Sequence, residues 1–267
     1  MSAHARELVP AEIQRHLATA RLGRRVYFFP ETDSTNDVAL ELARAGEAEG
    51  AVVVADFQRH GRGRRGHTWS SPRGHDLLVS LILRPGGDAR SVLAVTLVVA
   101  TAVSVALSKL LERDIAVRWP NDVVAPAGKV AGLLAETSAG AHGVSHVVVG
   151  IGINVNSGAA DLPPATHLAP ASCLTLTGMR WDRARLLADV LGVVESYYDR
   201  FRRDGFAPLR DACEARLAQV GRAVAFERGG ARETGVARGV ALDGALRVEL
   251  DRGGEAELYT ETVEVLA

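Results

Sequence analysis

The sequence predicts a mixed α/β domain over residues 1–220, followed by a small β-barrel domain over residues 221–267. Two observations support this division. As far as residue 220, apolar strand-like runs are interspersed with helical segments. From Gly221 onward, short strands follow one another between glycine turns, which is typical of a small barrel. At 267 residues the chain is long enough for one large domain and one small domain.

Composition indicates a soluble enzyme and argues against a nucleic-acid-binding protein. Hydrophobic residues make up 47%, charged residues 24%, and the formal net charge is -1, so no overall field attracts nucleic acid. Cys173 and Cys213 lack metal-ligand spacing, which predicts packed thiols in a reducing cytoplasm. Met1–Pro10 has no apolar core, so we expect no signal peptide. The apolar run Val92–Leu107 has 16 residues, too few for a membrane helix, and predicts a helix buried under a sheet.

The N-terminal region is predicted to form a helix, a strand and a second helix. Pro10–Ala20 is amphipathic, and Val26–Phe29 is a short apolar run typical of a strand. Asp33 or Ser34 can cap the second helix. The polar side chains of residues 34–36 allow two interpretations. They only cap this helix, or they and its free amides hold a small polar or anionic group.

Five further strands are predicted in the larger domain: Ala51–Phe57, Asp76–Leu83, Ile115–Trp119, Lys129–Glu136 and His146–Val155. Val92–Leu111 is predicted to be a buried helix, and Ala139–Gly143 to be the turn of a hairpin. Ser157–Met179 is predicted to be a loop because it is rich in Pro, Ala and Thr. Asp182–Arg203 and Pro208–Val220 are predicted to be charged helices that form a solvated cover.

The barrel is predicted from five short strands: Ala223–Glu227, Glu233–Val240, Ala245–Leu250, Ala256–Tyr259 and Thr262–Leu266. Glycine pairs and an Asp-Gly pair separate several of them, and such pairs form tight hairpin turns.

The segment Asp56–Pro72 carries the strongest chemical signal in the chain. Residues 61–66 read G-R-G-R-R-G, between Gln58 and Trp69. Glycines let the backbone approach a ligand closely, and guanidinium groups match phosphate or carboxylate oxygens two at a time. The composition fits a mobile flap that closes over an anion. Taken alone, it fits a flexible basic surface loop or a nucleic-acid contact equally well.

Three other features indicate a site. The tetrapeptide Trp119-Pro120-Asn121-Asp122 leaves an amide and a carboxylate at a strand end, where sites are often built, although Asn and Asp also form ordinary turns. Lys129 opens an apolar strand and is either a solvated edge residue or functional. Gly150 and Gly152 within an apolar run indicate the close approach of a ligand or another backbone.

Taken in order, these motifs resemble those of the biotin–protein ligases. The matching segments are Ser34-Thr35-Asn36, Gln58 with G-R-G-R-R-G and Trp69, W-P-N-D at residues 119–122, K-V-A-G-L-L-A-E at residues 129–136, and G-I-G-I-N-V-N at residues 150–156. Each motif alone is weak to moderate, and their common order and spacing make the resemblance specific. It runs from about Val26 to the C-terminus.

The resemblance implies a fold and an activity. The fold is a mixed-sheet catalytic domain, related to class II aminoacyl-tRNA synthetases, followed by an SH3-like barrel. The activity joins biotin to ATP, giving biotinyl-5'-AMP, and then biotinylates a lysine of the biotin carboxyl carrier protein. ATP, Mg²⁺ and biotin are the implied substrates and metal. Only about 25 residues precede the first strand, so we expect a ligase without the DNA-binding repressor module that some members carry.

The resemblance also implies which residues form the site. The residues expected to bind biotin are Ser34, Thr35, Gln58, Gly61, Arg62, Arg64, Lys129 and Gly132. Nucleotide binding falls to Arg62, Arg64, Trp69, Asn121, Lys129 and Asn154. Catalysis falls to Lys129, Arg62 and Asp122, with Asp122 orienting Lys129 or helping the incoming amine to lose its proton. The metal ligands stay unassigned.

Two departures and two alternatives accompany this assignment. His60 and His67 flank the arginine loop and are expected to be exposed. Residues 259–263 lack the Gly-Glu pair usual before the last strand, so no nucleotide contact is assigned to the barrel.

A lipoate–protein ligase shares the implied fold and chemistry but lacks the arginine flap. A non-catalytic nucleic-acid or ligand-binding module is disfavoured by the net charge. The chain is expected to be a monomer or a homodimer.

Overall fold

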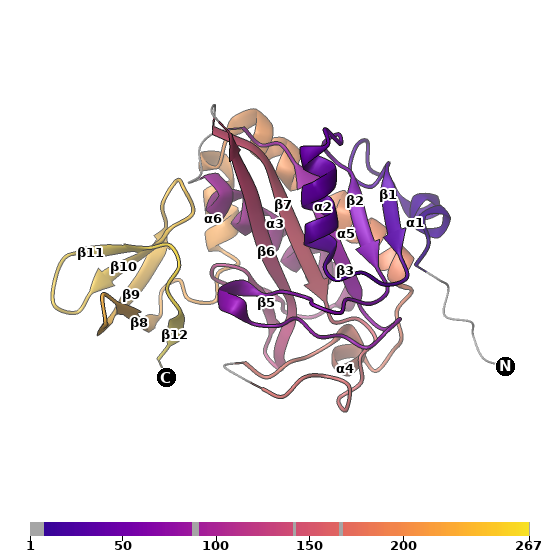
Figure 1. Ribbon diagram of the computed structural model, residues 1–267. Helices are drawn as coiled ribbons and strands as arrows, with labels where there is room; N and C mark the ends of the chain where they lie inside the picture. Colours follow the sequence, from indigo (N-terminus) through magenta and orange to yellow (C-terminus); the bar gives the residue numbers. More distant parts are fainter. Residues whose placement is uncertain (1–7, 87–90, 141–142, 166–167, 267) are drawn as a thin grey trace.

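The computed structural model describes residues 8–86, 91–140, 143–165 and 168–266, and its main feature is a seven-stranded sheet (Figure 1). The strands of this sheet are β1 Val26–Phe29, β2 Val52–Ala55, β3 Leu77–Leu83, β4 Ala116–Arg118, β5 Asp122–Ala125, β6 Gly128–Gly140 and β7 Gly143–Ile153. Their order across the sheet is β1-β2-β3-β7-β6-β5-β4. Only β1 and β2 run parallel, and the other neighbouring pairs are antiparallel. The predicted mixed sheet is therefore confirmed.

A second, smaller sheet forms the C-terminal part of the molecule. Its strands are β8 Ala223–Arg228, β9 Ala231–Val240, β10 Leu246–Leu250, β11 Glu255–Leu258 and β12 Val263–Val265. They are all antiparallel, in the order β11-β10-β9-β8-β12. This small β unit lies beside the large sheet, on the side away from the N-terminus (Figure 1). All five strands lie within about three residues of their predicted limits.

Helices cover both faces of the large sheet (Figure 1). The helices are α1 Pro10–His16, α2 Thr35–Arg44, α3 Ser91–Leu111, α4 Cys173–Thr177, α5 Arg183–Asp204 and α6 Arg210–Glu214. α3 and α5 share one core with the sheet, and α2 packs on the opposite face against a smaller core. Successive strand residues point to opposite faces, so β3 sends Leu81 into the first core and Ile82 into the second. This double burial explains its unbroken apolar run.

The apolar helix α3 is a core helix. Its length and composition would also suit a membrane span, but most of its residues are buried under the sheet. Burial of such a helix on every side removes the need for an amphipathic pattern. The prediction of a helix buried under a sheet is confirmed.

Several predicted elements differ from those observed. α5 is not merely a solvated cover, because Leu187, Val190 and Val194 are buried in the main core, at the spacing of an apolar helical stripe. The region predicted as loop after residue 157 contains α4, which begins with a capping box at Ser172. The helix predicted over Pro208–Val220 is limited to α6 and the preceding turn. Within the predicted turn over residues 139–143, residues 141 and 142 lie outside the described chain.

One buried carboxylate fixes the N-terminal segment to α5. Glu195 accepts hydrogen bonds from the backbone amides of Ala20 at 2.6 Å, Arg21 at 2.8 Å and Leu22 at 2.7 Å. Burial opposes ionisation of this carboxyl, but the three amides outweigh that cost and hold the pKa of Glu195 below its ordinary value.

Glu195→Gln is expected to destabilise the fold at pH 7 by about 2 kcal/mol, because an amide presents N–H groups to N–H donors. The ionised wild-type group stabilises the fold above its unfolded-state pKa of about 4.5, and this contribution is lost as the pH falls through the lower folded-state value. Urea unfolding at pH 7 and pH 3 should show the difference between variant and wild type shrinking in acid. Glu41→Gln, on the exposed side of α2, is the control, and an equal loss at both pH values would contradict the prediction.

Candidate functional site

A cavity of about 310 Å³ lies against the large sheet, within the range of small-molecule sites. It is bounded by the start of α2, by the segment of residues 58–70, by the ends of β4 to β7, and by residues 261–263 at the start of β12. Among its lining residues are Ser34, Thr35, Gln58, Arg62, Arg64, Trp69, Asn121, Asp122, Lys129, Gly132 and Asn154. All the predicted site residues except Gly61 are thus brought together, although they come from distant parts of the sequence.

Two paired glycines form a seat for the indole of Trp69. Gly132 on β6 and Gly152 on β7 lie opposite each other in the sheet. A Cβ added at Gly132 would lie 2.9 Å from Cζ3 of the indole, and one at Gly152 would lie 2.6 Å from Cζ2. The ring therefore lies directly on the backbone, where no other residue type would leave room. The Nζ of Lys129 lies 5.5 Å from the ring centroid, close enough for a cation–π contact.

Gly152→Ala is expected to raise the KM for a ligand that stacks on Trp69 by about 10-fold, because the added methyl displaces the indole. The measurement is the initial rate of the implied ligase reaction at increasing ATP concentrations, with far-UV circular dichroism to confirm folding. Gly192→Ala is the matched control, since a Cβ there meets open space on a helix. An unchanged KM in Gly152→Ala would show that the position of the indole is unimportant.

Lys129 is held rigidly with its amine in the cavity. Its backbone N–H donates to Ala169 O at 2.7 Å, and its carbonyl accepts from Ala171 N at 2.8 Å, so residues 169–171 run beside it like an added strand. Its Nζ lies 2.7 Å from Oδ1 of Asp122, the first residue of β5. Lys129 is therefore not a solvated edge residue, and its ion pair with Asp122 is the contact that the predicted orienting role requires. Residues 119–121 form the turn between β4 and β5, which confirms the turn prediction, and Asn121 and Asp122 also line the cavity.

The two asparagines predicted to bind the nucleotide also form hydrogen bonds within the protein through their side-chain amides. Asn121 donates from Nδ2 to Leu133 O at 2.8 Å and accepts on Oδ1 from Arg64. Asn154 donates from Nδ2 to Ala171 O at 2.9 Å, and more weakly to Lys129 O at 3.4 Å. Both residues line the cavity, but these bonds also make them supports for Arg64 and Lys129.

The glycine–arginine segment forms a hairpin across the cavity. Arg62 pairs with Thr68, and Trp69 N donates to Gly61 O at 2.9 Å. Gly61 itself faces outside the main cavity, and a Cβ there would lie 2.8 Å from Nε2 of Gln58, so lack of space explains this glycine. At the tip, Arg65 has φ 55° and Gly66 φ 77°, the left-handed conformation that closes the turn.

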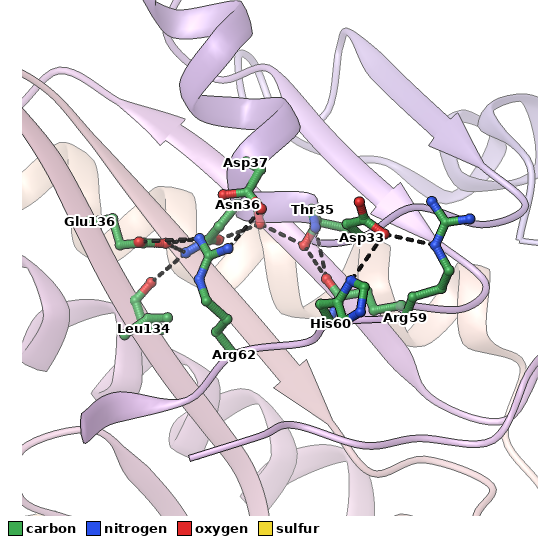
Figure 2. Close-up of polar contacts among 11 residues, drawn as sticks. Asp33, Thr35, Asn36, Asp37, Arg59, His60, Arg62, Leu134 and Glu136 are labelled. Carbon is green, nitrogen blue, oxygen red and sulfur yellow. Dashed lines mark hydrogen bonds and ion pairs between the residues drawn. The ribbon is translucent and has the colours of Figure 1, made fainter. Parts of the chain in front are cut away.

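The three arginines of the hairpin point to different partners. Arg62 forms ion pairs with Asp37 at 2.7 Å and Glu136 at 3.0 Å (Figure 2), and the hydrogen bond to Asp37 is the largest cause that raises its pKa. Arg64 lies in the cavity with Nη1 3.3 Å from Asn121 Oδ1. Burial, followed by the charge of Arg65, lowers the pKa of Arg64. Arg65 reaches the loop before β12, where it donates to Thr260 O and Thr262 Oγ1.

The start of α2 meets Gln58 at the other end of the cavity. Gln58 Oε1 accepts from Thr35 N at 2.8 Å and from Thr35 Oγ1 at 2.9 Å. Ser34 occupies the N-cap position, but its hydroxyl makes no capping hydrogen bond. The predicted N-cap position of Ser34 is confirmed, but its side chain does not cap the helix, and this buried residue lines the cavity.

Several cavity residues were not predicted from the sequence. Residues 261–263 of the small β unit line it, although no nucleotide contact was assigned to that part of the chain. Asp37, Ser80 and Glu136 form polar contacts beside it. Glu136 could have been predicted from the sequence, because it is a carboxylate in an apolar strand and lies on the same face as Gly132.

His60 and His67 are exposed, as expected, and His67 borders the cavity. Among the described residues, no group of three or more His, Cys, Asp or Glu side chains is arranged to hold a metal ion.

Comparison with known proteins gives consistent matches. The model of the Biotin/lipoate A/B protein ligase family matches residues 28–154. The bifunctional ligase/repressor BirA of Bacillus subtilis (strain 168) is 30% identical, over 97% of this chain and 79% of that protein. The biotin–[acetyl-CoA-carboxylase] ligase of Paracoccus denitrificans is 38% identical, over 80% of this chain and 90% of its own. The structure of the biotin protein ligase from Aquifex aeolicus in complex with biotin and ATP is 28% identical, with a TM-score of 0.77, over 91% of this chain and all of that one.

Proposed function

The chain belongs to the Biotin/lipoate A/B protein ligase family, and we propose that its cavity carries out biotin–protein ligation. The enzyme activates biotin with ATP, giving biotinyl-5'-AMP and pyrophosphate, and then transfers the biotinyl group to a lysine of a biotin carboxyl carrier protein. The observation that carries this proposal is the Lys129–Asp122 pair in one cavity with Arg64, Trp69 and the Thr35–Gln58 contact.

In the first step, a carboxylate oxygen of biotin attacks the α-phosphorus of ATP, and the bond from that phosphorus to pyrophosphate breaks. Two anions must approach each other, so positive charge that is fixed before the reaction lowers the barrier. Lys129 and Arg64 supply this charge, and Asp122 holds the amine of Lys129 in place. Arg62 is predicted to share the task, but Asp37 and Glu136 balance much of its charge.

Biotin enters with its ureido ring towards the start of α2. Burying this polar group requires hydrogen-bond partners, which Ser34, Thr35 and Gln58 offer. Gln58 Nε2 donates to no other group in the described ranges, so it is available to the ureido carbonyl. Gly61 lets the backbone lie close to Gln58, and Gly132 lets Trp69 and Lys129, which border the proposed biotin site, lie directly against the sheet.

Adenine stacks on Trp69, with Asn121 and Asn154 at its edge. The indole is held flat on the two glycines, which gives the base a rigid surface. Mg²⁺ enters with ATP as part of the substrate. In such sites phosphate oxygens and water supply most of its ligands, which fits the lack of a carboxylate cluster among the described residues.

In the second step, the amine of the carrier lysine attacks the carbonyl carbon of the adenylate, and the bond to the AMP oxygen breaks. The amine must lose a proton, and Asp122 is the carboxylate at the reacting end of the cavity that can assist. Its existing bond to Lys129 makes orientation of that lysine its first role.

The wider assignments follow from this function. We propose a catalytic domain over residues 1–220 and an SH3-like barrel over residues 221–267, in a cytoplasmic monomer or homodimer that does not bind nucleic acid. The sheet of the barrel begins at Ala223, which supports that boundary.

The test is pyrophosphate release from ATP with biotin, lipoate or no acid, followed by mass spectrometry of a carrier domain. Release that requires biotin, with addition of one biotinyl group to the carrier, supports the proposal. Release with lipoate alone would favour the lipoate–protein ligase alternative. Stabilisation by an oligonucleotide, and not by biotin, in a thermal-shift assay would favour the binding-module alternative.

A further inference from the structure

Arg62 fastens the arginine hairpin to the rest of the protein through two ion pairs. Arg62 contacts two carboxylates, Asp37 in the first turn of α2 and Glu136 on β6 (Figure 2). Its Nη1 lies 2.7 Å from Asp37 Oδ2, and its Nη2 lies 3.0 Å from Glu136 Oε2 and 3.2 Å from Oε1. Both terminal nitrogens of the guanidinium are thus engaged by the protein.

Glu136 is held in position by buried groups independently of the hairpin. Asn36 donates from Nδ2 to Glu136 Oε2 at 2.6 Å, and its Oδ1 accepts from Ser80 Oγ at 2.6 Å. Asn36 is 4% exposed and Ser80 is fully buried. Neither Asn36 nor Ser80 belongs to the hairpin, so the rest of the protein preorganises the carboxylate to receive the guanidinium.

The same buried groups lead to the biotin end of the cavity. Ser80 Oγ lies 2.8 Å from Thr35 Oγ1, and Thr35 donates to Gln58. The position of Glu136 is therefore connected by short hydrogen bonds to the residues proposed to bind the ureido ring. Arg64, two residues after Arg62, lies inside the cavity. Fixing Arg62 consequently fixes the segment that carries Arg64.

We propose that Asp37 and Glu136 are positioning residues that hold the hairpin closed over the adenylate through Arg62. In this inference, which rests on the proposed function, Arg62 anchors the lid and Arg64 contacts the ligand. The alternative is that the two carboxylates compete with the ligand for Arg62. The two ideas predict opposite effects when a carboxylate is removed. A lid without its anchor releases the adenylate faster, whereas Arg62 freed from competitors binds the ligand more tightly.

The experiment measures two rates on the full-length enzyme. Single-turnover formation of biotinyl-AMP from ATP labelled at the α-phosphate gives the chemical step. Loss of label from the protein after a chase with unlabelled ATP and biotin gives release. Asp37→Asn and Glu136→Gln are each expected to speed release by about 5-fold, as expected for a partly exposed ion pair, and to slow formation by a smaller factor, because Arg64 lies on the segment that Arg62 fixes. Added salt should speed wild-type release and affect the variants less.

Asp33→Asn is the matched control. Asp33 forms an ion pair of 2.7 Å with Arg59, which precedes the hairpin, but touches neither Arg62 nor Glu136 in the part of the chain that is described (Figure 2). It is expected to release the adenylate at the wild-type rate. Asp37 is nearly half exposed, so Asp37→Asn keeps the test available if Glu136→Gln disturbs Asn36 and the fold.

Two results would overturn the inference. Wild-type release in both variants would mean that the anchor has no effect on retention, and slower release or tighter biotin binding would mean that the carboxylates compete with the ligand. An enzyme that forms no adenylate even as wild type would instead contradict the proposed function, so the two failures are distinguishable.

Discussion

Replacing Lys129 by alanine is expected to slow adenylate formation at saturating biotin and ATP by about 100-fold or more. The amine is the positive charge proposed to meet the α-phosphate, and a fixed charge at a developing anion contributes about 3 kcal/mol or more to the transition state. The substitution also leaves Asp122 unpaired beside two incoming anions, which adds repulsion. Pyrophosphate release under single-turnover conditions measures the effect.

The chain supplies a direct control, because its only other lysine is Lys109 on α3. Lys109 is exposed, and Lys109→Ala should form the adenylate at the wild-type rate. Asp122→Asn keeps the charge on Lys129 but weakens its orientation, so its effect should be smaller than that of Lys129→Ala. A rate of adenylate formation near that of wild type in Lys129→Ala would contradict the catalytic role proposed for Lys129.

Arg64→Gly is expected to weaken retention of the adenylate by about 2 kcal/mol, close to a 30-fold faster release. The guanidinium lies half-buried in the cavity beside Asn121, and glycine also adds backbone freedom to the hairpin. A mixed anhydride reacts with any accessible amine, so escaped adenylate acylates proteins without selection. Bystander proteins incubated with the variant, biotin and ATP should therefore carry biotin on scattered lysines.

Arg44→Gly, in the last turn of α2 and outside the hairpin, is the control for this effect. Wild type and control should label only the carrier protein. If Arg64→Gly keeps the adenylate as tightly as wild type and labels no bystander, the hairpin does not act as the lid.

Most elements of the fold were predictable because their signals are local. The strand Leu77–Leu83 is a continuous apolar run, and the helix Ser91–Leu111 has no charge before Lys109. The burial of α5 was missed because its many charges obscured an apolar stripe at helical spacing. Strand β5 was missed because Asp122 resembles a turn residue until its partner Gly132 is known.

The site was predictable where its residues carry recognisable motifs, as Lys129 and Gln58 do. The roles of the other site residues depend on contacts between segments that are distant in the sequence. The need for glycine at position 152 is explained by Trp69, which lies on it. The role of Glu136 is explained by its contacts with Arg62 and Asn36, which come from two other segments. Contacts at such sequence separations leave no periodic signal along the chain. The contribution of residues 261–263 was missed for the same reason.

The most direct test of the proposed chemistry is isotope exchange between labelled pyrophosphate and ATP without carrier protein. Reversible adenylate formation on the enzyme predicts that exchange requires biotin, that lipoate does not replace it, and that Lys129→Ala lowers the rate by about 100-fold while Lys109→Ala leaves it unchanged. Exchange that proceeds equally without biotin, or that survives in Lys129→Ala, would contradict the assignment of biotin activation to this cavity.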